Sequence, residues 1–198
     1  MSALHPVPAD ALHTQAWANG AGTTTVIASG PDESHWQWRL SIADITQDCA
    51  FSSYPDTRRQ FVALDAPIHL HFGDRRKAAL LRLAVTHFDG ADAPHAQLPD
   101  GPTRAFNLML RGDAEGSLIA RPLNGSMWLP VRESWVWFVY LLSGQAEVQA
   151  EDERMNMDAG SSLWIDASSH QRIRIEGGGE LVLVHLAKNP SQAGLPQT

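Results

Sequence analysis

The chain has 198 residues, of which 43% are hydrophobic and 19% are charged, and its formal net charge at pH 7 is −7. This composition is that of a soluble globular protein with a buried core, and it excludes the collagen-like, fibrous and intrinsically disordered classes. Because only 15 Lys and Arg residues stand against 22 Asp and Glu residues, few cations are available for phosphate contacts, and we expect no nucleic acid as a partner.

The sequence predicts neither a targeting or membrane-spanning segment nor a disulfide framework. No window approaches about 18 uninterrupted apolar residues, and residues 1–6 lack the basic and apolar regions of a signal peptide. We therefore expect a cytoplasmic protein without a membrane partner. The single cysteine, Cys49, excludes an intrachain disulfide framework, and the neighbouring Asp48 is expected to reduce the reactivity of its thiol.

Short runs rich in Val, Ile, Leu, Phe and Trp are separated by Gly and Pro, which is typical of an all-β protein. The predicted strands are Thr23–Ala28, Trp36–Ile42, Gln60–Leu64, Ile68–Phe72, Lys77–His87, Ala105–Arg111, Ser117–Leu123, Trp135–Ser143, Gln145–Ala150, Ser161–Asp166, Gln171–Glu176 and Leu181–Leu186. Their short spacing favours antiparallel pairing. Ser143-Gly144 and Gly177-Gly178-Gly179 are predicted to be tight turns between strands.

About twelve strands are too many for one small barrel and suit two, so we predict two sequential antiparallel jelly-roll β-barrels. Periodicity alone leaves one larger sandwich open. The polar, Gly-containing segment 110–116 marks the boundary. Residues 1–112 are predicted to form a first module with a ligand pocket, residues 113–188 a mainly structural second module with homodimer formation left open, and residues 189–198 a frayed tail.

Polar residues alternate with apolar ones along two predicted strands of the first module. Arg39 and Ser41 share one face of their strand, and Asn107 and Arg111 share one face of theirs. A solvent face usually carries Lys, Glu and Thr, whereas arginine interleaved with small and amide side chains fits a concave polar site. A solvent-facing role stays open. Arg59 begins another strand and is placed to reach the same site.

These residue types suit a small anionic ligand. Arginine presents a planar fork that binds a carboxylate through two hydrogen bonds, and Asn both donates and accepts. An aromatic ring would add a flat apolar wall. The glycines of the Asn19–Gly22 turn allow its backbone N–H groups to approach and bind an anion. Alternatively, the segment is a plain turn that leads into the next strand. We predict that the ligand is a small polar or anionic metabolite and that the ligand-binding residues are Asn19, Gly20, Thr24, Arg39, Ser41, Arg59, Phe106, Asn107 and Arg111.

The histidine pattern gives little support for a metal. His69 and His71 form the only His-x-His pair, but no Glu follows at a useful spacing and the cations of residues 75–77 would repel a divalent ion. We expect both histidines to face water, with Ile68, Leu70 and Phe72 in the core, and we expect no metal or other cofactor. His185 is predicted to be a core or pocket-mouth histidine.

Four sequence blocks resemble the HutD/Ves family. They are Trp17-Ala18-Asn19-Gly20-Ala21-Gly22-Thr23-Thr24, residues 38–45, Phe51-Ser52-Ser53-Tyr54-Pro55 followed by Arg59, and residues 106–111. The resemblance implies a two-module cupin fold in a bacterial cytoplasmic protein. Its HutD branch implies a regulator of histidine utilisation that responds to a small molecule such as urocanate or formiminoglutamate, and its Ves branch implies a stress-associated protein.

One departure from the family pattern and two alternative functions remain. Where many relatives have an Arg-Glu pair after the Asn-Gly segment, this chain has Thr25-Val26, so a ligand contact through that pair does not carry over. An enzyme of another class, an isomerase or a hydrolase, would use the same pocket with acidic residues brought together from distant strands. A purely structural interaction module would bind no ligand.

Overall fold

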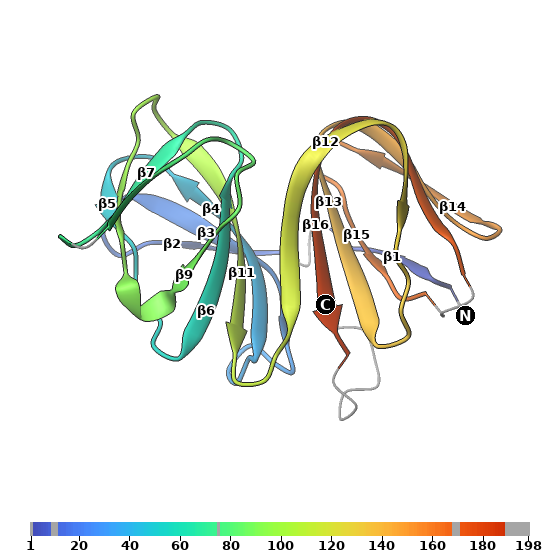
Figure 1. Ribbon diagram of the computed structural model, residues 1–198, viewed down its shortest axis with the longest axis horizontal. Coiled ribbons are helices and arrows are strands. Elements are labelled where there is room, and N and C mark those ends of the chain that lie inside the picture. The colour runs from blue at the N-terminus through green and yellow to red at the C-terminus, as the bar shows by residue number, and fades with distance from the viewer. Residues whose placement is uncertain (1, 9–11, 75, 168–170, 189–198) are drawn as a thin grey trace. The chain divides into compact units, whose positions relative to one another are not determined.

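The computed structural model describes residues 2–8, 12–74, 76–167 and 171–188 (Figure 1). Within these ranges the regular structure is β-strand apart from one short 3-10 helix, η2 (Gly90–Asp92). The prediction of an all-β protein is confirmed. The helices of the described ranges include none with the length and apolar character needed to span a bilayer. The predicted frayed tail, residues 189–198, lies outside the described residues.

The strands alternate with short connections along the whole described chain. In chain order they are β1 (Leu4–Pro6), β2 (His13–Ala16), β3 (Gly22–Gly30), β4 (Trp38–Ile45), β5 (Cys49–Ala50), β6 (Thr57–Ala63), β7 (Ile68–Phe72), β8 (Arg76–Leu80), β9 (Thr86–Asp89), β10 (His95–Gln97), β11 (Thr103–Arg111), β12 (Gly116–Leu129), β13 (Trp135–Ala150), β14 (Glu153–Asp158), β15 (Ser162–Ile165) and β16 (Ile173–Ala187).

The chain forms two compact units, Asp10–Ala114 and the combination of Met1–Ala9 with Glu115–Thr198. The predicted first module contained the N-terminus, whereas the structure joins β1 to the second unit. The reason is that β1 pairs antiparallel with β15, Leu4 opposite Ile165, and that Leu4 belongs to the apolar core of that unit.

The Asp10–Ala114 unit contains two antiparallel sheets, β2-β3-β4-β11-β6-β9 and β5-β10-β7-β8. Phe61 and Ala105 from the larger sheet and Ile68 and Leu70 from the smaller one belong to a single apolar cluster. This clustering follows from the alternation of each strand, because every second side chain points to the same face. The larger sheet thus has one face toward the core, and the site described below lies on part of that face.

The unit that contains Glu115–Thr198 is built on one sheet in the order β1-β15-β13-β16-β12, with β14 also paired to β13. Its core is formed by aliphatic, aromatic and methionine side chains, among them Val139, Leu141, Leu163 and Leu183, all of which are inaccessible or nearly so. Burial of this much apolar surface provides the main stabilisation of such a unit.

The predicted turns at Ser143-Gly144 and Gly177–Gly179 are wrong. Strands β13 and β16 (Figure 1) run through these glycines. Gly144 lies opposite Gly179 in their ladder. Both have positive φ, +84° and +138°. A Cβ atom on Gly179 would lie 1.8 Å from the carbonyl oxygen of Ser143. The glycines therefore bend two long paired strands where bulky residues would clash.

The predicted strand Lys77–His87 is also wrong, because it is divided between two sheets. Strand β8 pairs with β7 in the smaller sheet, whereas β9 pairs with β6 in the larger one. Between them Leu81 is exposed and Leu83 has a positive φ of 63°. The run contains no Gly or Pro, so nothing in its residue types marked the break.

Candidate functional site

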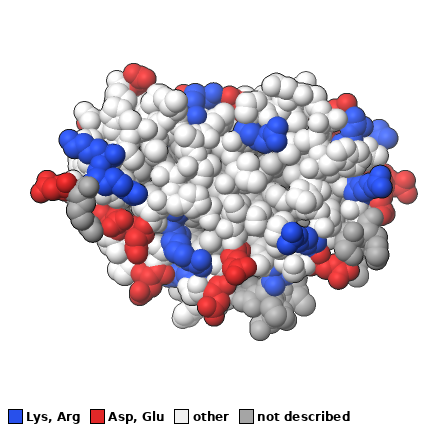
Figure 2. All heavy atoms as spheres, viewed as in Figure 1, with Lys and Arg blue, Asp and Glu red and all other residues white. Residues whose placement is uncertain are grey.

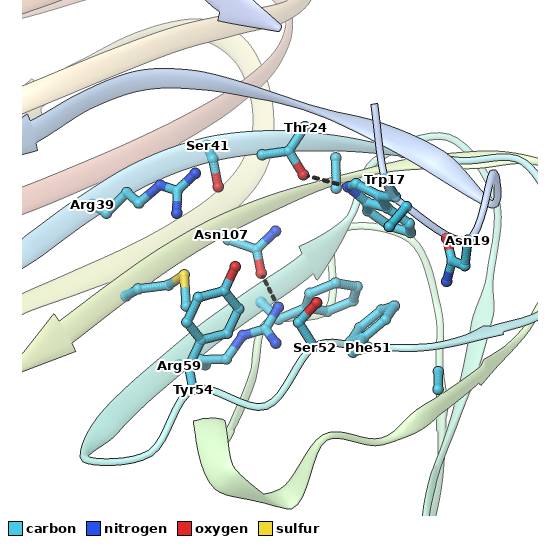
Figure 3. Close-up of a pocket in the computed structure, with 15 residues that line it drawn as sticks. Trp17, Asn19, Thr24, Arg39, Ser41, Phe51, Ser52, Tyr54, Arg59 and Asn107 are labelled. Atoms are coloured by element: carbon cyan, nitrogen blue, oxygen red, sulfur yellow. Dashed lines mark hydrogen bonds between the residues drawn. The ribbon is translucent and has the colours of Figure 1, made fainter. Parts of the chain in front are cut away.

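A cavity of about 260 Å³ lies in the Asp10–Ala114 unit (Figure 3). This volume is just below the usual range of about 300–1,000 Å³ for ligand pockets, which suits a small metabolite rather than a large cofactor. Its lining comes from the segment before β3, from β3, β4, β6 and β11, and from the segment that begins in β5. The lining residues are Trp17, Ala18, Asn19, Thr24, Arg39, Ser41, Ala43, Ala50, Phe51, Ser52, Tyr54, Arg59, Phe61, Asn107 and Met109.

Strand register brings the polar side chains of the cavity together. Met109 on β11 lies opposite Arg39 on β4 and opposite Arg59 on β6, so these three residues form one row across the sheet. Asn107 lies opposite Ser41 and Phe61 in the next row on the same face. Because side chains two residues apart point the same way, both rows face the cavity.

Arg59 is a buried cation, with only 7% of its surface exposed. Its Nη2 donates a hydrogen bond to Oδ1 of Asn107 at 2.7 Å. Its guanidinium carbon lies 4.9 Å from the ring centre of Phe88, 5.3 Å from that of Phe51 and 5.9 Å from that of Tyr54. These rings supply a favourable electrostatic environment for a cation, but they carry no compensating negative charge.

The charge of Arg59 is incompletely compensated by the described residues around it. Its Nε is buried and has no hydrogen-bond partner, and no carboxylate of the described residues forms an ion pair with it. Burial lowers the pKa of the Arg59 guanidinium to about 10, Tyr54 opposes this lowering, and the positive charge of Arg39 adds to it. A buried cation of this kind is costly unless an anion joins it.

Arg39 is half-buried and lies on the same face of the sheet as Arg59. In the described ranges no hydrogen bond or ion pair engages its guanidinium group. On the molecular face shown in Figure 2, Lys and Arg side chains lie interspersed with Asp and Glu. The cavity differs, because its lining includes two arginines and no acidic residue. The cavity is therefore a local site of positive charge in a chain of net charge −7.

The turn between β2 and β3 contributes Trp17, Ala18 and Asn19 to the cavity lining. Nε1 of Trp17 donates to Oγ1 of Thr24 at 2.7 Å, and Oδ1 of Asn19 accepts from the backbone N–H of Ala21 at 3.0 Å. A Cβ atom on Gly22 would lie 1.9 Å from the carbonyl oxygen of Asp44, so glycine is required for this close approach. The turn thus fixes Trp17 and Asn19 at the cavity.

Phe51 and Tyr54 form an aromatic side of the cavity. Their backbone N–H groups donate to the carbonyl oxygens of Pro94 and Gly90, each at 2.9 Å, which positions the segment after β5. The Phe51 ring packs on Phe61 with the ring centres 5.6 Å apart. Ser52 lies between the two aromatic residues in sequence and adds a hydroxyl group to the lining. The cavity therefore combines a cationic row with an apolar aromatic surface.

The structure brings six of the predicted ligand-binding residues into the lining, namely Asn19, Thr24, Arg39, Ser41, Arg59 and Asn107. Three others are not lining residues. Gly20 shapes the turn with a φ of +69°. Phe106 is fully buried on the opposite face of β11 from Asn107. Arg111 donates from Nε to Oγ1 of Thr57 and stacks on Trp36, with its guanidinium carbon 3.6 Å from the ring centre.

The sequence prediction omitted several lining residues, chiefly Trp17, Phe51, Ser52, Tyr54 and Met109. A signal for all of them was present, because each lies within the blocks that resemble the HutD/Ves family. Strand alternation also placed Met109 on the face of Asn107. The loop residues could not be found by alternation, since their contacts depend on how the segment after β5 folds over the sheet.

The two histidines of the His-x-His pair are half-buried, whereas Ile68, Leu70 and Phe72 are buried. This confirms the predicted division of the strand into two faces. Among the described residues, no group of three or more His, Cys, Asp or Glu side chains is arranged to hold a metal ion. His185, predicted as a core or mouth residue, stacks on Trp135 with ring centres 4.2 Å apart.

Comparison with known sequences gives a family and several relatives. The model of the HutD family matches residues 9–183. The chain is 35% identical over 98 residues to Protein Ves of Escherichia fergusonii, covering 48% of this chain and 51% of that protein. It is 31% identical over 112 residues to an uncharacterized 21.2 kDa protein in the hutC 3′ region of Pseudomonas putida, covering 55% of this chain and 59% of that protein. The matches span about half the length of these curated relatives.

Solved structures share the fold. A conserved protein of unknown function from Pseudomonas aeruginosa PAO1 matches with a TM-score of 0.82 at 22% identity, covering 94% of this chain and 98% of that one. HutD from Pseudomonas fluorescens SBW25 matches with a TM-score of 0.76 at 24% identity, covering 94% of this chain and 100% of that one. A Cupin 2 conserved barrel domain protein from Leptotrichia buccalis matches with a TM-score of 0.52 at 9% identity, covering 84% of this chain and 88% of that one. The fold is therefore cupin-like.

Proposed function

The chain belongs to the HutD family, and we propose that it is a two-module cupin whose Asp10–Ala114 unit binds a small anionic metabolite without transforming it. Each unit would be one jelly-roll module, the first with the ligand site and the second mainly structural. The four sequence blocks that resemble the HutD/Ves family are consistent with this assignment, since they supply most of the cavity lining.

The observation that carries the proposal is the buried Arg59. A guanidinium that is 7% exposed, with an unpartnered Nε and no carboxylate beside it, has unused capacity to bind an anion. Asn107 fixes its orientation through the 2.7 Å hydrogen bond. An arginine held in this way presents its remaining donors to a carboxylate, which is the group that matches its planar geometry.

The lining residues favour binding over catalysis. In the described part of the chain they include no histidine, cysteine, lysine, aspartate or glutamate. These are the side chains that most often transfer protons or act as nucleophiles near neutral pH. A site of arginine, asparagine, serine and aromatic residues can hold and orient an anion. We therefore place ligand recognition, and not an isomerase or hydrolase reaction, at this cavity.

The biological role we propose is regulation of histidine utilisation in the bacterial cytoplasm. Two relatives support it: one lies in the hutC 3′ region of Pseudomonas putida, and the other is HutD of Pseudomonas fluorescens, whose structure was determined in a formate condition. Formate is the smallest carboxylate. Urocanate carries one carboxylate and formiminoglutamate carries two, and each has a polar nitrogen group, so both suit a site of arginine and asparagine.

Isothermal titration calorimetry with formate, urocanate and formiminoglutamate tests the binding site. We expect saturable binding of at least one of them, weakened more than tenfold in Arg59→Met and within twofold of the wild type in Arg58→Met. Arg58 is the matched control, because it is the exposed neighbour whose Nη2 donates to the carbonyl oxygens of Gly112 and Ala114. No binding of any carboxylate at millimolar concentration would overturn the site.

Gene deletion in the protein's own host tests the biological role. Transcription of the histidine-catabolic genes during growth on histidine is expected to change in the deletion strain. The wild-type gene should restore the normal level, whereas the Arg59→Met gene should not. Unchanged transcription in the deletion strain would remove the regulatory role and leave the binding site to be judged by calorimetry alone.

A further inference from the structure

Two arginines face one cavity from opposite sides of a single strand. Arg39 on β4 and Arg59 on β6 are both register partners of Met109 on β11. Since neighbouring strands lie about 4.8 Å apart, the two arginine Cα atoms are separated by roughly 10 Å. Figure 3 draws both side chains among the cavity-lining residues. One bound molecule is therefore within reach of both guanidinium groups.

The two cations have different surroundings. Arg59 is buried and fixed by Asn107 and the aromatic rings, whereas Arg39 is half-buried and has no hydrogen-bond or ion-pair partner among the described residues. The charges also repel each other, because Arg39 contributes to lowering the pKa of Arg59. No acidic residue of the lining offsets either charge. A ligand with one negative charge would leave one arginine uncompensated.

Apolar surface lies between the two arginines. Met109 separates them in the row, and Phe61, fully buried, lies in the next row beside Asn107. A ligand that reached both arginines would place its middle part over Met109. Methylene groups suit that position, because a thioether and an aromatic ring offer dispersion contacts and few hydrogen bonds.

We propose that the cavity binds a small dicarboxylate, with one carboxylate on the buried Arg59 and the other on Arg39. This inference rests on the proposed function and makes it more specific, since it requires two negative charges rather than one. The aliphatic linker of the ligand lies over Met109. The buried Arg59 and Asn107 fix one end, and the more accessible Arg39 closes the other.

The test compares each dicarboxylate with its own half-amide, which has the same length and one negative charge fewer. Calorimetry is carried out on the full chain with succinate and succinamate, glutarate and glutaramate, and adipate and adipamate. We expect the best-fitting dicarboxylate to bind at least tenfold more tightly than its half-amide. In Arg39→Met the ratio of the half-amide Kd to the dicarboxylate Kd should fall below three, whereas Arg58→Met should keep the wild-type ratio.

The results separate this inference from the proposed function. If half-amides or formate bind and every dicarboxylate binds no more tightly than its half-amide, the dicarboxylate site is overturned and the anion site stands. A preference for dicarboxylates that persists in Arg39→Met also overturns the assignment of Arg39. If none of the monocarboxylates, half-amides and dicarboxylates binds to the folded wild-type chain, the anion site and the dicarboxylate site fail together.

Discussion

At the scale of single residues, the buried charge of Arg59 lowers the stability of the folded chain. Burial first, and Arg39 in addition, hold its pKa near 10 in the folded chain. This lowering corresponds to about 3 kcal/mol. Because the folded value lies below the ordinary one, the penalty applies in full at every pH below about 10. It fades only as the pH rises from there toward the ordinary arginine value.

We predict that Arg59→Met stabilises the unliganded protein. Removal of the buried charge should recover about 3 kcal/mol, and the loss of the hydrogen bond to Asn107 should take back about 1 kcal/mol. A net gain of roughly 1–2 kcal/mol is expected in urea-induced unfolding without ligand. Arg58→Met, on the exposed side of the same strand, should change the free energy of unfolding by less than about 1 kcal/mol. A loss of stability in Arg59→Met would contradict the charge-burial argument.

The half-buried His185 has a second uncompensated polar atom. Its Nδ1 is buried without a hydrogen-bond partner, and its ring stacks on Trp135 and meets Trp137 edge-on at 5.2 Å between centres. Burial, and then the positive charge of Arg132, lower the pKa of His185 below its ordinary value of 6.5. The folded chain therefore favours the neutral imidazole.

The expected consequence is a loss of stability in mild acid. The pKa of His185 is lower in the folded chain than in the unfolded chain. The contribution of the neutral imidazole to the free energy of unfolding is therefore complete above about pH 6.5 and is lost as the pH falls through the folded pKa. His185→Phe keeps a stacked ring and removes the titration. Urea unfolding at about pH 7.5 and 5.5 should show a smaller pH effect in this variant than in the wild type. Equal pH effects in both proteins would contradict the assignment.

At the scale of elements, glycines bend the long strands of the second unit. Gly178 and Gly179 are adjacent in β16, yet an added Cβ has open space at the first and a clash with the Ser143 carbonyl at the second. We predict that Gly179→Ala lowers the free energy of unfolding by on the order of 3 kcal/mol or prevents folding. Gly178→Ala should cost less than about 1 kcal/mol. Chemical denaturation measures both, and equal effects would contradict the bend.

The same glycines show why strand boundaries were hard to predict. Ser-Gly and Gly-Gly-Gly are the residues of tight turns, and they are also the residues of a sharp bend between two paired strands. Only the partner strand distinguishes the two, since Gly144 faces Gly179 across the ladder. The local sequence therefore predicted most of the long strands, missed β1, β2, β5, β10 and β14, and led to the prediction of turns where two strands bend.

The site was partly predictable for a related reason. Arg39, Ser41 and Asn107 lie on regular strands, where alternation alone assigns them to one face. Phe51 and Tyr54 lie outside that regularity, and their place at the cavity depends on backbone hydrogen bonds to residues some 40 positions later in the chain. Alternation also could not show that Arg59 is buried, which is the feature that carries the functional proposal.

At the scale of the whole molecule, strand β1 joins the start of the chain to a sheet formed by its second half. The Glu153 carboxylate accepts hydrogen bonds from the backbone N–H of Ala3 at 3.1 Å, from that of Leu4 at 3.2 Å and from Oγ of Ser2 at 2.8 Å. These bonds, that from Ser2 first, lower the pKa of Glu153 below its ordinary value. Glu153 thus anchors β1 beside β15.

We predict that Glu153→Gln loosens β1 without unfolding the sheet, because the neutral amide is a weaker acceptor and its oxygen cannot accept all three bonds equally well. Hydrogen exchange at Ala3 and Leu4 should become faster, with Glu151→Gln as the exposed control. In the wild type, exchange should accelerate as the pH falls below about 4.5, after correction for the intrinsic rate, since the lowered pKa means that the carboxylate form holds β1. Unchanged exchange in Glu153→Gln would contradict the anchor.

The pairing of β1 with β15 also sets an order of events during synthesis. Leu4 leaves the ribosome about 160 residues before its partner Ile165. At roughly 5–20 residues per second, β1 waits about 8–30 s for its neighbour. All of Asp10–Ala114 has been made by then. When Ala114 has been made, the Asp10–Ala114 unit is complete in sequence and free to fold, whereas the other unit still lacks β12 to β16.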